Sequence, residues 1–473
     1  MNLGEKNLKK KIITCALGLF AVIGLSACIS NPSKGSSSLE DAGQTIEEFD
    51  AEVEALGDLK NLTAEVTFWH TMGKANQDVF NTIIAEFNKT YPNITINHSQ
   101  QGGYPDVRKN IANAIPAHTT PTMAYCYPDH VADYLPSDSV IKLDNYINST
   151  KIGFGVDNGL GDTGKDDFIQ TYLSEGDHYT LEGKALSGYY SVPFSKSTEV
   201  LFYNKDAFEA AGWSVPETWD QMWKLCATIK ETYPDVIPLG YDSDANFFIT
   251  YCEQAGIPYT TGEGNEHFLF NNAEAKAFVT KLKEYADKGY WTSQGLLGSG
   301  TYTSTKFTNQ ELLMTIGSTG GTKYNVSTNF STGVAGLPQV DKNNGKVIMQ
   351  GPSICFLNDS TFKERVAGWL FYKFITNADN SAIWSSMTGY NPVRTSSFAS
   401  KNYKTSSTPL VNDVLDFAGT KSNYTDWYYA SPAFKGSSAA REEMDSLMAG
   451  VLNGSKTVDA AFEDAYNNCL FAA

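Results

Sequence analysis

The chain has 473 residues, of which 41% are hydrophobic and 13% aromatic, and its formal net charge is −17. This ordinary globular composition supplies enough apolar residues for two lobes with separate cores. The acidic charge argues against a nucleic-acid partner, because neutralising phosphates requires a basic face that no charge run in the sequence supplies.

The first 27 residues have the pattern of a signal peptide. Lysines precede an apolar run from Ile12 to Ala27, which is short for a membrane span. The run ends in LSAC, and Ser- and Gly-rich residues follow. This pattern resembles a bacterial lipoprotein signal, which implies that residues 1–27 are removed and that Cys28 carries diacylglycerol and palmitate chains. The mature chain is then expected outside the cytoplasm, anchored to the bacterial cell membrane. An ordinary signal peptide with an incidental cysteine is the alternative.

Residues 28–61 are predicted to form a lipidated, flexible tether, because SNPSKGSSS is a typical spacer. The acidic segment after the spacer leaves a short helix open as an alternative. Its apolar residues stand near helical spacing: Leu39, Ile46, Phe49, Val53 and Leu56.

The cysteines that follow the tether are scattered and contain no CxxC pair, which excludes a disulfide framework and a zinc site. Most are expected to be small buried residues, with one disulfide left open. They are Cys126, Cys226, Cys252, Cys355 and Cys469. No cofactor or metal is predicted.

The pattern of the ordered region predicts an α/β fold. An alternating strand over 64–70 is followed by an amphipathic helix that stops near Tyr91-Pro92 and by a second strand in NITIN. This order indicates a crossover in a parallel-type sheet. Similar helical units recur at 216–241, 274–291 and 361–377, which is more than one compact lobe needs.

The stretch SVPFSKSTEVLFY, residues 191–203, is strand-like but contains Pro193 and a polar centre. A buried central strand tolerates such a proline poorly. A segment that crosses between two lobes tolerates it, and Ser197 would then lie on the floor of a cleft. An edge strand with a solvated polar patch is the alternative.

Four sequence motifs between residues 62 and 470 occur in an order that is typical of one protein family. They are FWHTMGKANQDVFNTIIAEFNKTYPNI, PFSKSTEVLFYNKDAFEAAGW, PETWDQM and TGYNPVR. They resemble the extracellular solute-binding proteins of carbohydrate-import ABC transporters, and most of all the glycerol-3-phosphate-binding subgroup. The resemblance implies a two-lobed periplasmic-binding-protein-like fold with hinge crossings and a central cleft, and no catalysis. Lobe one would hold 62–195 and 353–394, and lobe two would hold 196–352 and 395–470.

The resemblance also implies ligand-binding residues, at Tyr104, Ser197, Ser318, Gly351 and Tyr390. Of these, Tyr390 is suited to stack on a sugar face and to donate a hydrogen bond. Trp69 and His70 are added because they end the first strand, where ligands of open α/β sheets collect. A core position for Trp69 and a structural hydrogen bond for His70 are the alternatives.

The chain departs from the glycerol-phosphate pattern at three places. Where that subgroup has a carboxylate residue, the aligned position here is Pro128, with Asp129 beside it. Where the subgroup has a cleft tryptophan, the aligned positions here are 242–245. The phosphate-binding arginine of the subgroup aligns near Ala433, in a segment rich in aromatic residues. The absence of an arginine at this position removes the strongest contact that a phosphate could make. Arg394 or Arg441 could replace it, although Arg441 is predicted to lie on a helix surface.

Acidic and aromatic residues in place of the arginine favour a neutral carbohydrate ligand. The residues concerned are Asp129, Asp242, Trp427, Tyr428 and Tyr429. The predicted function is therefore capture of a sugar or oligosaccharide by lobe closure and its delivery, by a monomeric binding protein, to an ABC transporter permease. The alternatives are a glycerol-3-phosphate or glycerophosphodiester binding protein, a lipid-anchored glycosidase that uses Asp129 and Asp242, and a chemoreceptor or adhesin.

Overall fold

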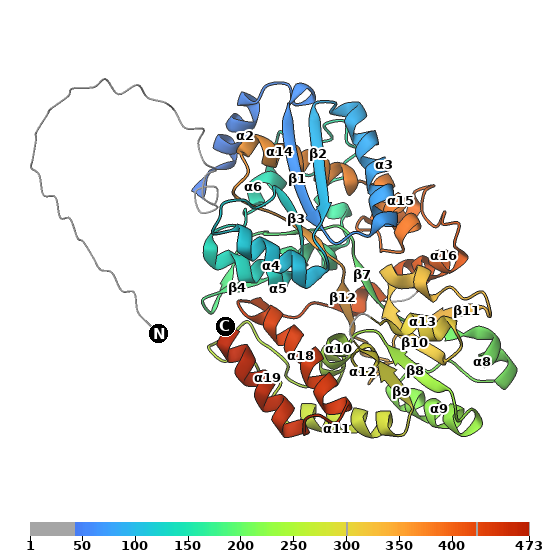
Figure 1. The fold of residues 1–473 in the computed structure, drawn as a ribbon. Coiled ribbons are helices and arrows are strands. Elements are labelled where there is room, and N and C mark those ends of the chain that lie inside the picture. The colour runs from blue at the N-terminus through green and yellow to red at the C-terminus, as the bar shows by residue number, and fades with distance from the viewer. Residues whose placement is uncertain (1–42, 299–300, 422–423, 473) are drawn as a thin grey trace, which may run out of the picture. The chain divides into compact units, whose positions relative to one another are not determined.

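The computed structural model describes residues 43–298, 301–421 and 424–472 (Figure 1). The predicted signal peptide and the predicted lipidation at Cys28 lie outside the described residues. Within those ranges, no helix has both the length and the apolar character that crossing a membrane requires.

Lobe one is built on a mixed sheet. Its strands, in spatial order, are β2 (Ile94–Gln100), β1 (Ala64–His70), β3 (Met123–Cys126), β13 (Ser353–Phe356) and β6 (Val192–Pro193). β1 pairs in parallel with β2 and β3, whereas β13 is antiparallel to β3 and β6. The parallel pairing of β1 and β2 across α3 confirms the predicted strand–helix–strand unit, and it sends the carboxyl ends of these strands to one edge of the sheet.

The helices of lobe one pack around this sheet (Figure 1). They are α2 (Ile46–Ala55), α3 (Lys74–Thr90), α4 (Tyr104–Ala114), α5 (Pro128–Tyr134), α6 (Asp144–Asn148), α7 (Gln170–Ser174), α14 (Phe362–Ile375) and α15 (Ala378–Thr388). α3 is amphipathic as predicted, with Phe80, Ile83 and Phe87 on its buried face. It ends at Thr90, just before Pro92 pushes the chain out of helical geometry.

The prediction of a flexible tether is wrong for residues 46–61. α2 begins at a capping box in which Thr45 and Glu48 bond each other's backbone amides, and its apolar face buries Phe49 and Val53 in the core. Asp50 accepts hydrogen bonds from the Ser149 hydroxyl at 2.5 Å and the Thr150 amide at 3.0 Å. Burial of this face fixes the segment to lobe one, as the alternative of a short helix expected.

Lobe two is built on a second mixed sheet. Its strands, in spatial order, are β14 (Tyr428–Tyr429), β12 (Val347–Gln350), β7 (Ser197–Asn204), β10 (Leu312–Ser318), β8 (Ile237–Tyr241) and β9 (Trp291–Ser293), with β11 (Thr332–Ala335) paired to β7. β8 and β10 run parallel, and both end toward lobe one (Figure 1).

The helices of lobe two surround the second sheet. They are α8 (Lys205–Ala211), α9 (Trp219–Thr232), α10 (Asp244–Ala255), α11 (Ala273–Asp287), α12 (Gln294–Leu297), α13 (Thr303–Thr308), α16 (Pro409–Asp416), α17 (Tyr424–Trp427), α18 (Ser437–Leu452) and α19 (Val458–Ala472). A small third sheet joins β15 (Ala433–Phe434) to the hairpin β4 (Tyr179–Leu181) and β5 (Lys184–Leu186). The cysteines of the described residues are buried with free thiols, which fits small core residues.

The stretch SVPFSKSTEVLFY crosses from one sheet to the other. β6 occupies the edge of the first sheet, where Pro193 costs no ladder bond, and β7 lies inside the second. Two other segments cross beside it. The Ser195 amide donates to the Pro352 carbonyl at 3.1 Å, and the Asn391 amide donates to the Lys196 carbonyl at 2.7 Å. The predicted hinge crossing is therefore confirmed, and the alternative of an edge strand with a solvated patch is wrong.

Candidate functional site

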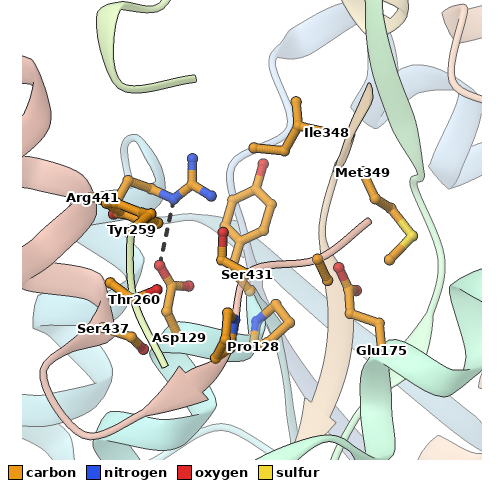
Figure 2. A pocket seen from close by; sticks show the side chains of 13 residues that line it. Pro128, Asp129, Glu175, Tyr259, Thr260, Ile348, Met349, Ser431, Ser437 and Arg441 are labelled. Carbon is orange, nitrogen blue, oxygen red and sulfur yellow. Dashed lines mark ion pairs between the residues drawn. The ribbon is translucent and has the colours of Figure 1, made fainter. Parts of the chain in front are cut away.

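A pocket lies where the two lobes meet (Figure 2). Lobe one contributes the start of α5 and Glu175, and lobe two contributes β12, the segment 430–432 and α18. Its volume is about 30 Å³, which is room for roughly one water molecule. Its lining residues are Tyr127, Pro128, Asp129, Glu175, Tyr259, Thr260, Ile348, Met349, Ala430, Ser431, Pro432, Ser437 and Arg441.

An ion pair joins the lobes inside this pocket. Figure 2 shows the guanidinium of Arg441, on α18, facing the carboxylate of Asp129, with 3.6 Å between Nε and Oδ2. Arg441 Nη1 also donates to Asn246 Oδ1 at 2.6 Å. Burial acts to lower the pKa of Arg441, but Asp129 and nearby tyrosines raise it overall, so the side chain is charged. The predicted helix-surface role of Arg441 is wrong, because α18 directs this residue toward α5.

Glu199 is the buried acidic group behind the ion pair. Its Oε2 accepts from the Tyr241 hydroxyl at 2.5 Å, and its Oε1 accepts from Asn246 Nδ2 at 3.1 Å and Gln350 Nε2 at 3.3 Å. Burial raises the pKa of Glu199 to about 7, against the effect of the hydrogen bonds. Asn246 thus connects Glu199 to Arg441. Glu199 was not among the predicted site residues, although a charged residue two positions after Ser197 in an otherwise apolar strand is a signal for such a site.

Three of the predicted ligand-binding residues lie together beside the pocket. The ring centroids of Tyr104 and Tyr127 are 4.8 Å apart, and the phenol of Tyr390 lies close enough to that of Tyr104 to affect its pKa. The backbone of Gly351 lies near the Tyr127 hydroxyl. Because Tyr127 also lines the pocket, it links the Tyr104–Tyr390 pair to the Asp129–Arg441 pair.

Gly351 and Gly320 allow the backbones to come this close. Gly351 has a φ of 82°, and a Cβ there would collide with the Ser195 carbonyl of the neighbouring crossing. A Cβ on Gly320 would lie 2.9 Å from the ring of Tyr390. Ser318, at the end of β10, accepts from the Gly320 amide at 3.2 Å and so fixes the turn beneath that ring.

The remaining polar residues of the prediction lie at strand ends. Ser197 begins β7 opposite Gln350 and is buried. Asp242 follows β8, and its Oδ1 accepts from the Thr303 amide at 2.8 Å and hydroxyl at 2.6 Å. Burial raises the pKa of Asp242 despite these bonds. Neither residue lines the pocket, so their ligand contacts stay a prediction.

His70 lies buried among hydrogen-bond partners, which fits its structural alternative and gives no support to its predicted ligand contact. The ring is fully buried, Nε2 lies 2.8 Å from His98 Nδ1, and Nδ1 accepts from the Met72 amide at 3.1 Å. Burial, together with His98, lowers the pKa of His70 to about 3, so the ring is neutral. Trp69 is partly buried and packs against a core cluster of lobe one, which fits its core alternative.

The buried His70 predicts a loss of stability in acid. Its pKa falls from 6.5 to about 3 on folding, so its contribution is complete above pH 6.5 and is lost as the pH falls toward 3. Between pH 7 and pH 5 this loss amounts to about 2 kcal/mol. Urea unfolding at several pH values should therefore give a flatter profile for His70→Asn than for the wild type. His118→Asn, at an exposed site, is the control, and parallel profiles for His70→Asn and wild type would refute the assignment.

The aromatic residues near position 428 lie in two different environments. Trp427 packs over Gly345 and Tyr424, outside the pocket, so a ligand contact for it has no support in the structure. Tyr428 stacks on Tyr172 with centroids 5.3 Å apart, and the Tyr429 hydroxyl donates to Thr250 at 3.3 Å.

Arg394 is committed to the core of lobe one. Its Nη2 pairs with Asp162 Oδ1 at 2.8 Å, its Nε donates to the Thr376 carbonyl at 2.8 Å, and the guanidinium lies 3.6 Å from the centroid of Phe168. Arg394 is therefore not available as the replacement for the phosphate-binding arginine that the sequence left open.

The fold and the site between its lobes define a solute-binding protein. The chain belongs to the bacterial extracellular solute-binding protein family, whose sequence pattern matches residues 82–409. It is 28% identical over 356 residues to the sn-glycerol-3-phosphate-binding periplasmic protein UgpB of Pectobacterium atrosepticum. The aligned region covers 71% of this chain and 74% of that protein. The protein is thus an extracytoplasmic solute-binding protein of an ABC transporter.

Solved structures show the same fold. UgpB from Mycobacterium tuberculosis, in complex with glycerophosphocholine, superposes with a TM-score of 0.69 at 17% identity, covering 87% of this chain and 98% of that one. The GacH receptor of Streptomyces glaucescens, solved unliganded and with acarbose, gives a TM-score of 0.68 at 17% identity, covering 86% and 97%. Both likenesses confirm the predicted two-lobed α/β architecture.

Proposed function

We propose that this protein captures a neutral carbohydrate between its lobes and delivers it to the permease of an ABC transporter. The observation that carries the proposal is the pairing of charge in the pocket. Among the described lining residues, Arg441 is the basic side chain, and Asp129 already faces it at 3.6 Å. A phosphate there would meet a neutralised cation and a carboxylate, which disfavours an anion.

The same groups suit a sugar. Carboxylates such as Asp129 accept hydrogen bonds from vicinal hydroxyls, and the lining tyrosines Tyr127 and Tyr259 offer an apolar face and a hydroxyl. Acarbose, a carbohydrate-like ligand, is bound by the similar GacH receptor. These features support the carbohydrate over an anionic solute.

Closure of the lobes would couple binding to delivery. A ligand that touches both lobes favours the closed form by its differential contacts. A shift from mostly open to mostly closed needs about 5.5 kcal/mol of such difference, which several hydrogen bonds of about 1 kcal/mol each and ring stacking supply. We propose lobe limits at 195/196, 352/353 and 394/395, within the three crossing segments.

Attachment to the membrane belongs to the same proposal. Lipid chains on Cys28 would hold a monomeric binding protein near its permease, with residues 29–44 as the spacer. A glycosidase is disfavoured, because Asp242 is bonded by Thr303 and Asp129 by Arg441, and because the family is one of binding proteins.

The second candidate ligand is glycerol-3-phosphate or a glycerophosphodiester. The names of similar proteins favour it, and so does the presence of Arg441 in the pocket. This ligand would have to separate Arg441 from Asp129 to form the bidentate contact that a phosphate prefers.

A thermal-shift screen of the purified protein tests the proposal. Sugars, oligosaccharides, glycerol-3-phosphate and glycerophosphocholine are compared, since binding to the native state adds about 2.7 kcal/mol at a hundredfold excess over Kd. We expect a neutral saccharide to raise the melting temperature and Tyr390→Ala to abolish the shift, because that substitution removes the ring that lies beside Tyr104. Tyr233→Ala, at an exposed tyrosine 47% accessible, should keep the shift. A response to the phosphorylated compounds alone would contradict the proposal.

A further inference from the structure

A larger cavity adjoins the Asp129–Arg441 pocket. Its volume is about 480 Å³, within the range of roughly 300–1,000 Å³ of small-molecule sites. The two cavities share the wall formed by Pro128, Glu175, Met349, Ala430, Ser431 and Pro432. The Asp129–Arg441 pocket alone has room for about one water molecule, so the space for a ligand lies mainly in its neighbour.

Both lobes build this larger cavity. Lobe one supplies residues 171–180 and the end of the β4–β5 hairpin, and lobe two supplies Gly262, Glu263 and the segment 428–433. β15 pairs in parallel with β4, so that Ala433 lies opposite Tyr179. A ligand in the cavity would therefore contact both lobes, as lobe closure requires.

The chemistry of the lining fits a neutral polyhydroxylated ligand. Asp177 and Glu263 provide carboxylates, while Tyr179, Tyr428 and Tyr429 provide aromatic surface. The described lining residues include no lysine or arginine. Carboxylates accept from sugar hydroxyls and tyrosine rings pack on sugar faces, whereas an anion would be repelled.

Two buried hydroxyls point to a hydrogen-bonding ligand at the junction of the cavities. Ser431 Oγ, on the shared wall, and Thr260 Oγ1, in the smaller pocket, have no hydrogen-bond partner in the described part of the chain. A buried hydroxyl without a partner is costly, and such groups are found at sites that a ligand or water completes. Sugar hydroxyls at this junction would satisfy both.

We propose that the ligand is an oligosaccharide rather than a monosaccharide, and that the cavity bounded by 171–180 and 428–433 holds its additional sugar units. The inference rests on the proposed carbohydrate function. The sugar units lie in the larger cavity, with one end at the wall that it shares with the Asp129–Arg441 pocket.

The test combines two saccharide ladders with a variant that fills the cavity. Calorimetry measures binding of glucose, maltose, maltotriose and maltotetraose, and of the cellobiose-to-cellotetraose series. We expect the affinity to rise at least tenfold from the monosaccharide to a longer member of one ladder. Ala430→Trp, at a residue shared by both cavities, should remove that gain. Ala211→Trp, exposed on α8, is the matched control and should retain it.

Ser431→Ala provides a second variant that cannot block the cavity or disturb packing. It should lower the affinity for the longer saccharide several-fold without lowering the melting temperature of the free protein, because the hydroxyl has no partner there. Equal affinity for glucose and the longer sugars, or full retention of the gain in Ala430→Trp, would overturn the inference while leaving the proposed function intact. Absence of binding by every saccharide of both ladders would contradict the proposed function as well.

Discussion

Replacing Lys196 with methionine is expected to lower the free energy of unfolding by about 3–5 kcal/mol. Lys196 lies in the crossing segment, where its ammonium pairs with Glu175 Oε2 at 2.6 Å and donates to the Gly351 carbonyl at 2.9 Å. The side chains are 0% and 2% exposed. Ser353 also donates to Glu175, at 3.0 Å. The substitution would leave the Glu175 carboxylate buried without its cation, at the point where the crossings meet.

Equilibrium unfolding in urea measures this loss, and a double-mutant cycle separates its cause. Lys196→Met combined with Glu175→Gln should recover a large part of the lost stability, because neither charge then remains buried alone. Lys342→Met breaks an exposed pair with Glu217, whose side chains are 57% and 64% exposed, and should be nearly neutral. Equal, small effects at Lys196 and Lys342 would show that the buried pair does not stabilise the hinge.

The crossing itself could be predicted from the sequence, whereas its ion pair could not. Pro193 and the polar run after it conflict with a buried strand, and this local conflict identified the change of sheet. Glu175 stands 21 residues earlier, in a short helical turn with no pattern that relates it to Lys196. Only the packing of the lobe-one segment 170–177 against the crossings brings the two charges together.

In the candidate site, too, some residues could be predicted from the sequence and others could not. Tyr104, Gly351 and Tyr390 occupy conspicuous Gly-rich motifs, and the structure brings them together. Glu199 and Arg441 were missed or assigned to the wrong surface, because their roles depend on which face of β7 and α18 turns toward the other lobe. His70 stands at a strand end that favours ligands, but His98 on the neighbouring strand binds its ring, and a single strand's pattern does not contain that partner.

The contacts between α4, α5 and α18 form a clasp between the lobes, composed of Arg108, Asp133, Ser438 and Glu442. Arg108 donates to Asp133 Oδ2 at 3.1 Å and to Ser438 Oγ at 2.9 Å. Its Nη2 pairs with Glu442 Oε1 at 2.6 Å. Asp133 also accepts from the Gly436 amide at 3.2 Å, at the N-terminus of α18, where the helix dipole favours a carboxylate. Because α4 and α5 belong to lobe one and α18 to lobe two, these contacts exist only when the lobes are together.

Arg108→Ala is therefore expected to shift the protein toward the open form and to weaken ligand binding. Hydrogen bonds to charged groups contribute about 1.5–3 kcal/mol, and losing that amount from the closed form alone lowers the affinity about 10- to 100-fold when binding requires closure. Small-angle scattering should show a larger radius of gyration for the variant, and calorimetry should show the weaker binding. Lys109→Ala, at the next and exposed residue of α4, removes one positive charge without touching α18 and should change neither quantity. If Arg108→Ala and Lys109→Ala behave alike, the clasp does not hold the lobes together, and closure depends on the ligand and the crossings alone.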